Sequence, residues 1–252
     1  MRFEFAEKRI ALVVAHADDE TLAAGAHLKY WPNLTIIHVT DGSPRDGADA
    51  RREGFSSRDE YAKARREELG CAISEGEAEH ARLVEIGVPD QEAIANIGEV
   101  IERLQEALAG TEVVVTHPYE GGHPDHDACA LACQAALPHH GALWEFAGYH
   151  LRNGTIESGE FLGADGAEMR ARLFFENLAG EDLRRKEKML RCFRTQLGTL
   201  SQFRWNIEPF RRAPEVDFTQ PPHPGVLLYE TWGFAMNGQR WREYACEALR
   251  CR

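Results

Sequence analysis

The chain has 252 residues, of which 43% are hydrophobic and 28% are charged, and its formal net charge is −12. This composition is ordinary for a globular enzyme, and the length is sufficient for a full hydrophobic core. The acidic balance disfavours nucleic acid and anionic membrane surfaces as partners, because bulk electrostatics would repel both.

The apolar run at residues 10–15 is too short to span a bilayer, and no secretory leader is visible, so we expect a cytoplasmic protein. Six cysteines occur without a C-x-x-C pair, and we expect them to be reduced, buried thiols. Metal binding by Cys129 and Cys133, four residues apart on a predicted helix, is the less favoured alternative.

The first half of the chain alternates between strand and helix patterns. Continuous apolar runs predict buried parallel strands, and the longer segments between them predict helices. The predicted strands are residues 10–15, 34–39, 83–86 and 112–116, and the predicted helices are residues 21–31, 58–73, 91–108 and 127–137. This alternation predicts an α/β fold whose mostly parallel sheet carries helices on both faces.

The second half is less regular. We predict strands at 143–151, 168–175 and 226–229, helices at 180–196 and 238–249, and a hairpin turn at Asn153-Gly154. Because no repeat or linker divides the sequence, we expect a single domain over residues 1–252. The loops at 42–58 and 118–123 and the irregular part at about 140–252 would shape its substrate pocket.

Two clusters of histidine and acidic residues follow predicted strands. HADDE occupies residues 16–20, and HPDH occupies residues 123–126. The carboxyl ends of parallel strands meet at one edge of a sheet, where ligands bind, so we expect the two clusters to meet. Carboxylates packed this closely need a positive charge nearby, and a divalent metal is the simplest candidate.

The residue types suit a catalytic metal. One histidine and one aspartate from the first cluster and a histidine from the second would give zinc three protein ligands and an open position. The spare aspartate would then take a proton from a metal-activated water, and the spare histidine would stabilise the carbonyl oxygen or protonate the leaving group. Spacing alone does not decide between Asp18 and Asp19 for these roles. A helix cap or a turn is the structural alternative for either cluster alone.

The sequence also resembles a known family. AHADDE at residues 15–20 is similar to the AHPDDE signature of the LmbE-like, or PIG-L, deacetylases, and HPDH matches their second metal motif. Weaker matches are Thr40-Asp41-Gly42, the set Arg65, Glu68 and Ala72, and the set Lys186, Thr195 and Gln196. The resemblance covers about residues 8–200. It implies a Rossmann-like three-layer sandwich and zinc-dependent removal of acetyl groups from N-acetylglucosamine compounds.

The resemblance also implies a metal site and a base. His16, Asp19 and His126 would hold the zinc, and Asp18 would be the general base. Ala17 replaces the usual proline of the signature, which should loosen the loop without abolishing metal binding.

Four further residues are candidates around this centre. By resemblance, His123 would stabilise the tetrahedral intermediate, Asp125 would orient a neighbouring histidine, and Arg65 would contact the substrate. Tyr119 precedes HPDH in the same loop and is a candidate hydrogen-bond donor to the substrate carbonyl. By contrast, we expect core packing or a subunit interface rather than sugar stacking for the aromatic set Trp205, Tyr229, Trp232, Phe234 and Trp241.

We therefore expect a zinc-dependent hydrolase that removes an N-acetyl group from a small N-acetylglucosamine-type sugar or its conjugate. Fe²⁺ or another divalent ion is an alternative metal, because a set of two histidines and one aspartate is not exclusive to zinc. Two alternatives change the function: a metal-dependent amidase that acts on a thiol conjugate or another non-sugar amide, and a non-catalytic Rossmann-like binding module. The resemblance also leaves a homo-oligomer open.

Overall fold

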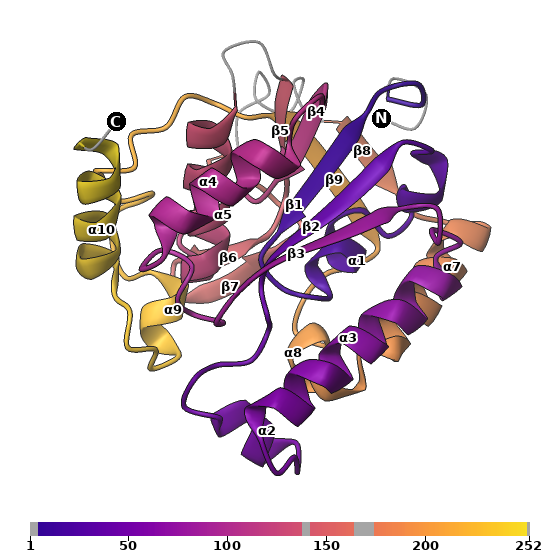
Figure 1. Ribbon diagram of the computed structural model, residues 1–252, viewed down its shortest axis with the longest axis horizontal. Coiled ribbons are helices and arrows are strands. Elements are labelled where there is room, and N and C mark those ends of the chain that lie inside the picture. The colour runs from indigo at the N-terminus through magenta and orange to yellow at the C-terminus, as the bar shows by residue number, and fades with distance from the viewer. Residues whose placement is uncertain (1–4, 138–141, 164–173, 251–252) are drawn as a thin grey trace.

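The computed structural model describes residues 5–137, 142–163 and 174–250. Its strands within these ranges are β1 (Ile10–Val14), β2 (Leu34–Thr40), β3 (Arg82–Val88), β4 (Val113–Thr116), β5 (Ala142–Phe146), β6 (Tyr149–Arg152), β7 (Thr155–Ser158), β8 (Phe174–Asn177) and β9 (Ile207–Arg212). Seven of them form one sheet in the order β3-β2-β1-β4-β5-β9-β8, and β6 pairs with β7 as a separate hairpin (Figure 1).

Most of the large sheet is parallel. β1 pairs in parallel with β2 and β4, and the parallel arrangement continues to β3 on one side and to β5 on the other. β9 is antiparallel to both β5 and β8. The predicted α/β fold with a mostly parallel central sheet is therefore confirmed.

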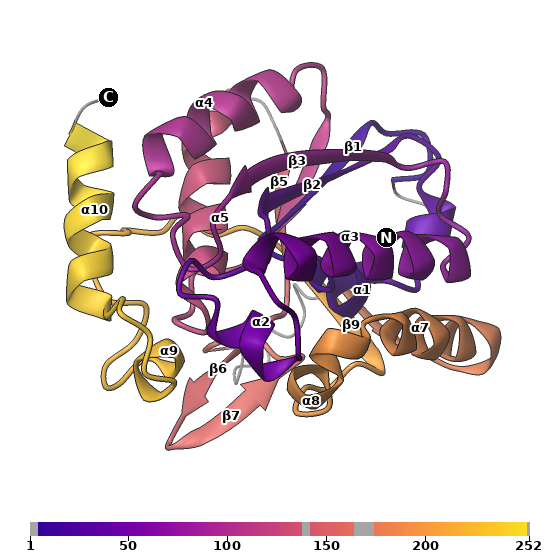
Figure 2. The same ribbon diagram turned by 60° about the horizontal axis from the view of Figure 1, so that its bottom comes forward.

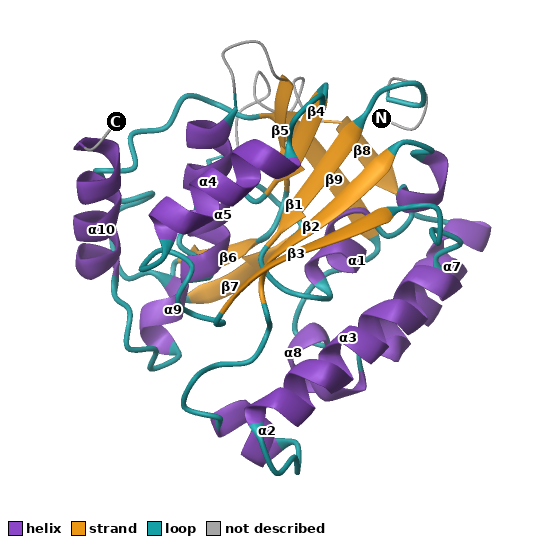
Figure 3. Cartoon of the chain, in the orientation of Figure 1, coloured by secondary structure: helices purple, strands orange, loops and turns teal. Residues whose placement is uncertain are grey.

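Helices cover both faces of this sheet. They are α1 (Asp19–Ala24), α2 (Ala48–Arg52), α3 (Arg58–Glu75), α4 (Ile97–Ala107), α5 (Pro124–Ala136), α7 (Gly180–Cys192), α8 (Leu197–Leu200), α9 (Leu228–Thr231) and α10 (Gly238–Arg250). Figure 2 shows α4 and α5 on one face and α1, α3 and α7 on the other. Figure 3 shows the strands between these layers, which confirms the predicted three-layer sandwich. Among the described residues, no helix is long and apolar enough to cross a membrane.

Each central strand supplies side chains to both layers. Successive side chains of a strand point to opposite faces. Ile10 and Leu12 therefore pack with α1, α3 and α7, whereas Ala11 and Val13 pack with α4, α5 and α10. These four side chains are almost completely buried. β1 is thus fixed on both sides, and the loop that follows it starts from a rigid base.

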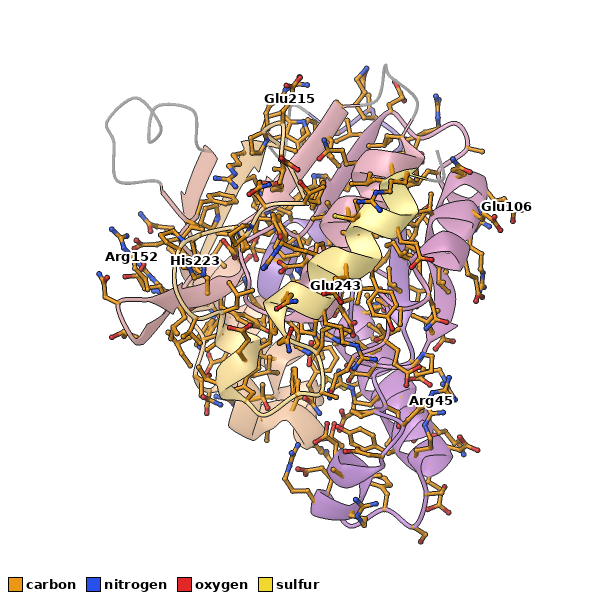
Figure 4. The ribbon with its side chains drawn as sticks, turned by 90° about the vertical axis from the view of Figure 1, so that its left-hand side faces the viewer. Arg45, Glu106, Arg152, Glu215, His223 and Glu243 are labelled. Carbon is orange, nitrogen blue, oxygen red and sulfur yellow. A yellow bond between two sulfur atoms is a disulfide. The ribbon has the colours of Figure 1, made fainter. Side chains whose placement is uncertain are left out.

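The C-terminal helix α10 completes the layer of α4 and α5. Its Trp241 is fully buried, and the indole Nε1 donates a hydrogen bond to the carbonyl of Pro124 at 2.9 Å. The outer face is polar, with Glu243 exposed on it (Figure 4). Core packing of Trp241 is therefore confirmed, and the contact holds the start of α5 in place.

Several predicted boundaries differ from the observed ones. α5 begins at Pro124, three residues earlier than predicted, so HPDH forms its N-cap and first turn. The predicted strand at 143–151 is divided between β5 and β6, which belong to different sheets. The predicted strand at 226–229 is wrong, because this segment leads into the short helix α9. Of the strand predicted at 168–175, residues 168–173 lie outside the described residues, and β8 begins at Phe174.

The cysteines require a correction. Cys71 and Cys192 form a disulfide, with their Cα atoms 5.8 Å apart, so they are not the reduced thiols that we expected. The bond joins α3 to the end of α7, elements that no sequence motif links. Cys129 and Cys133 are buried thiols in α5. Burial raises the pKa of both, which fits packing residues rather than metal ligands.

A buried ionic network fastens α7 to the sheet. The Lys186 ammonium donates hydrogen bonds to Glu208 Oε1 at 2.7 Å and to the carbonyl of Leu22 at 2.8 Å. The same carboxylate of Glu208, on β9, accepts from the backbone N–H of Ala26 at 2.9 Å and contacts His27 Nδ1. Both Lys186 and Glu208 are almost completely buried. The network thereby connects α1 and the residues after it to α7 and β9.

Removal of the cation should destabilise the fold strongly. We expect Lys186→Met to lower the free energy of unfolding by about 3–5 kcal/mol, because the Glu208 carboxylate would stay buried without its partner. Urea denaturation of both proteins measures the difference. The control is Lys188→Met on the same helix, where an exposed side chain is replaced and a change within about 0.5 kcal/mol is expected. Equal stability of the two variants would contradict a role for the network.

Candidate active site

The two sequence clusters meet at the carboxyl edge of the parallel strands. HADDE follows β1 and continues into α1, and HPDH opens α5 after β4. The side chains brought together here are at most 8% exposed: His16, Asp18, Asp19, Arg65, His123, Asp125 and His126. A cavity of about 370 Å³ lies beside them. The expected meeting of the clusters is therefore observed.

Asp19 lies between two imidazoles. Its Oδ2 is 3.3 Å from His16 Nδ1, and its Oδ1 is 3.3 Å from His126 Nε2. Ligand atoms that bind one zinc ion tetrahedrally at about 2.0–2.1 Å lie about 3.3 Å from one another. His126 Nε2 is buried and makes no hydrogen bond to any described residue. Two groups of donor atoms that lie within 4.8 Å of one another and could hold a metal include these side chains: His16 with His123 and His126, and Asp19 with His117 and His126.

His117 supports this group from behind. Its Nε2 accepts a hydrogen bond from the backbone N–H of Ala15 at 3.1 Å, and its ring stacks on His126 with centroids 3.8 Å apart. Burial, together with the neighbouring His126, lowers the pKa of His117 to about 3. A neutral His117 thus packs against His126. Together with Asp19 and His126 it also forms a group of donor atoms within 4.8 Å of one another, although it does not line the 370 Å³ cavity.

Two aspartates face the other nitrogen of His16. His16 Nε2 lies 3.1 Å from Asp90 Oδ1 and 3.4 Å from Asp125 Oδ2. Burial lowers the pKa of His16, but Asp90, Asp125 and Asp19 outweigh it and raise this pKa well above its usual value. Asp125 also accepts from the backbone N–H groups of Gln91 at 2.6 Å and Ala93 at 3.0 Å. Asp125 therefore holds both His16 and the loop that carries Asp90.

Asp90 was not among the predicted site residues. It follows β3 at the same sheet edge and lines the cavity. His16 was predicted because it is a titratable residue that follows a strand. The same pattern would have indicated Asp90 if the end of β3 had been placed correctly. His16, Asp90, His123 and Asp125 also form a group of donors within 4.8 Å of one another.

Asp18 has an unusual backbone and a charged neighbour. Its φ and ψ are 133° and −29°, a region that residues other than glycine rarely adopt. Such strain costs about 1–3 kcal/mol and is typical of functional positions. Arg65 Nη2 donates to Asp18 Oδ2 at 3.2 Å and to the carbonyl of Ala17 at 2.6 Å. Burial raises the pKa of Asp18 to about 7, although Arg65 opposes this.

The turn after β2 leaves room for this arginine. Gly42 has a φ of 61°, and a Cβ atom there would lie 3.3 Å from Arg65 Nε. A side chain at this position would therefore press on the guanidinium that holds Asp18.

Glu20, the last residue of HADDE, is turned away from the cavity. Its carboxylate accepts from the backbone N–H of Asp18 at 3.0 Å and lies 3.2 Å from His38 Nε2. Both Glu20 and His38 are buried. This pair supports the backbone around Asp18, and His38 is the core residue that its place in a strand suggests.

His123 is placed to donate into the cavity. It is the N-cap of α5, and its Nδ1 accepts from the backbone N–H of Asp125 at 3.2 Å. Burial, with the nearby His16 and His126, lowers the pKa of His123 well below its usual value. Because Nδ1 of the neutral ring accepts this hydrogen bond, the single ring proton resides on Nε2. His123 lines the cavity.

Tyr119 does not join the group. Its hydroxyl donates to the carbonyl of Gln220 at 2.9 Å, and its ring packs between Phe218 and Trp241. Packing of the second half against this loop, which the sequence does not reveal, turns Tyr119 into the core.

The aromatic set divides into two. Tyr229 and Trp241 are buried in the core, as expected. Trp232 and Phe234 are half-buried, and Trp232 packs against the small core cluster of Tyr149, Phe203 and Leu228. Both also line the cavity, with the Phe234 ring 5.2 Å from that of His123. Tyr149 also lines the cavity and was not predicted. The cavity thus has an aromatic side from the second half opposite charged residues of the first.

Known proteins share part of this sequence. The family model PIG-L, described as GlcNAc-PI de-N-acetylase, matches residues 11–137. A curated relative in Bacillus cereus, named "Probable N-acetyl-alpha-D-glucosaminyl L-malate deacetylase 2", is 23% identical over 137 residues, which are 52% of this chain and 61% of the relative. The Bacillus subtilis protein of the same name is 27% identical over 138 residues, with the same shares. The chain therefore matches about 61% of the length of these relatives.

Solved structures share the fold. The deacetylase Dbv21, which acts on the A40926 pseudoaglycone, superposes with a TM-score of 0.57 at 21% identity over 77% of this chain and 84% of that chain. The zinc-inhibited form of the teicoplanin deacetylase Orf2 has a TM-score of 0.58 at 15% identity over 82% of this chain and 100% of that chain. Because the family model covers just over half of the sequence, including HADDE and HPDH, the chain belongs to the PIG-L family.

Proposed function

We propose that this protein is a metal-dependent hydrolase that removes the N-acetyl group from an N-acetylglucosamine-type sugar or its conjugate. The observation that carries the proposal is the meeting of His16, Asp19 and His126 beside Asp18 at the edge of a large cavity. Membership of the PIG-L family and the names of the Bacillus relatives support the substrate class.

The residues suggest a division of labour. His16, Asp19 and His126 would hold the metal, and zinc is our choice because two histidines and a carboxylate with an open position are typical of catalytic zinc. When bound, the metal would polarise the amide carbonyl and acidify a water molecule. Asp18, held by Arg65, would accept the proton of the attacking water and return it to the leaving amine. The Nε2–H of His123 would donate to the carbonyl oxygen as its negative charge develops.

The lining of the cavity suits a sugar. Asp90 and Arg65 offer partners for hydroxyl groups, and Trp232 and Phe234 offer rings for the apolar face of a pyranose. Since both halves of the chain contribute to this lining, we also propose that residues 1–252 act as a single domain. Arg65, which donates a hydrogen bond to Asp18, would then also contact the substrate.

The test is a direct assay of the products. We expect the zinc-loaded protein to release free amine and acetate in equal amounts from N-acetylglucosamine or its malate conjugate, because amide hydrolysis yields one of each. A chelator should abolish the activity, and added metal should restore it. Amine reagents and enzymatic acetate determination provide the measurement. Turnover of non-sugar acetamides alone would favour the amidase alternative, and turnover of neither would favour a binding module.

A further inference from the structure

A second, much smaller cavity adjoins the first. Its volume is about 20 Å³, and Asp19, Leu22, Tyr149 and Phe203 line both cavities. His126 lines only the small one, whereas Asp18 and His123 line only the large one. The two cavities therefore share part of their walls at Asp19, beside His126.

The walls of the two cavities differ in character. Asp18, Arg65 and Asp90 line the large cavity. Apolar side chains make up most of the wall of the small one, including Leu22, Ala23, Phe146, Tyr149, Phe203 and Ile207. The polar residues in its wall are Asp19, His117, His126, Ser158 and Arg204. A charged or hydroxylated group would lose its hydration in the small cavity, whereas a methyl group would not.

We propose that the small cavity receives the methyl end of the acyl group and restricts the enzyme to acetyl substrates. This inference rests on the proposed hydrolysis of an N-acyl sugar. The carbonyl carbon of the amide is bonded to the carbonyl oxygen, the sugar nitrogen and the next carbon of the acyl group. These three substituents point in three different directions. A sugar needs the volume of the large cavity, so the acyl carbon points to another space. The small apolar cavity adjoins the donors and matches the chemistry of a methyl group.

The size of the cavity sets the restriction. A cavity needs about 10–15 Å³ to hold one water molecule, which is close to a methyl group in size, so 20 Å³ accepts little more than one such group. Its walls are closely packed. The ring of Phe203 stacks on that of Tyr149 with centroids 4.1 Å apart. The ring centroids of Phe146 and His117 are 4.6 Å apart. A longer acyl chain would have to displace these rings. Each extra methylene group is therefore expected to lower kcat/KM by about 10- to 200-fold.

A series of acyl lengths tests the restriction. The zinc-loaded protein is assayed with N-acetyl-, N-propionyl- and N-butyrylglucosamine, and kcat/KM is expected to fall along the series. Ile207→Ala enlarges the cavity and should raise the ratio of butyryl to acetyl turnover by about tenfold or more. Ile37→Ala is the matched control, because Ile37 is a fully buried core residue that lines neither cavity. This control should leave the ratio unchanged.

The opposite change fills the cavity. Ala23→Val adds two methyl groups to its wall and should lower kcat/KM for N-acetylglucosamine by about tenfold. Inhibition by free glucosamine should not change, because glucosamine has no acyl group. A role of Ala23 in packing alone would alter both measurements together.

A readout without turnover separates this inference from the proposed function. Saturation-transfer NMR measures binding of acetate and butyrate to the metal-loaded protein, and we expect the wild type to bind acetate only and Ile207→Ala to bind both. If the wild type hydrolyses all three N-acyl sugars equally well, the cavity proposal is wrong and the proposed function stands. If no N-acyl sugar is hydrolysed, the proposed function fails, and equal binding of acetate and butyrate to the wild type would overturn the cavity proposal as well.

Discussion

His126→Ala is expected to lose the bound metal and, with it, the hydrolytic activity. His126 and His16 stand on opposite oxygens of Asp19, each at 3.3 Å, so removal of one imidazole leaves a single histidine and a carboxylate. Removal of a residue that only hydrogen-bonds to a metal ligand lowers metal affinity by about 10- to 100-fold. Removal of a ligand itself should therefore lower the affinity by at least as much. Elemental analysis after dialysis should find about one zinc per chain in the wild type and almost none in the variant.

His150→Ala is the matched control for this experiment. His150 is also a fully buried histidine with an acidic neighbour, Glu120 at 3.3 Å, but it belongs to no group of metal donors among the described residues. The control should keep its metal. Full metal content in His126→Ala would show that the two sequence clusters do not share one ion. If the wild type stays free of metal even after supplementation, a binding module becomes the better interpretation.

The sequence predicts the metal donors because local pattern and topology agree there. HADDE and HPDH follow β1 and β4, which are adjacent and buried on both faces, so their apolar runs are easy to recognise. β3 instead lies at the edge of the sheet and is largely exposed. Its apolar run is therefore weak, its end was placed too early, and Asp90 was missed.

Other features depend on contacts between distant parts of the chain. The partners of the disulfide, Cys71 and Cys192, are 121 residues apart, and no local pattern relates them. Trp232 reaches the cavity because the segment around α9 is attached to the loop before HPDH, where the N–H of Leu228 donates to the carbonyl of Gly121 at 2.9 Å. The same packing of the second half draws Tyr119 into the core. Sequence patterns report periodicity and turns, and neither encodes these long-range contacts.

Asp18→Asn should keep the metal and lose turnover. Asn has the shape of Asp, and its carbonyl oxygen can still accept from Arg65, which donates to Asp18 Oδ2 at 3.2 Å. An amide cannot accept the proton of the attacking water, however, so kcat is expected to fall by about 10²- to 10⁴-fold, the range for loss of a general base.

The outcome can be separated from a structural effect of the substitution. Metal content and thermal stability should match those of the wild type, and KM should change little, because Asp18 would act in the chemical step rather than in uniform binding. Loss of metal together with activity would instead make Asp18 a ligand and exchange its role with that of Asp19. Unchanged kcat with a full complement of metal would exclude Asp18 as the base. Asp90, which also lines the cavity and contacts His16, would then be the next carboxylate to replace.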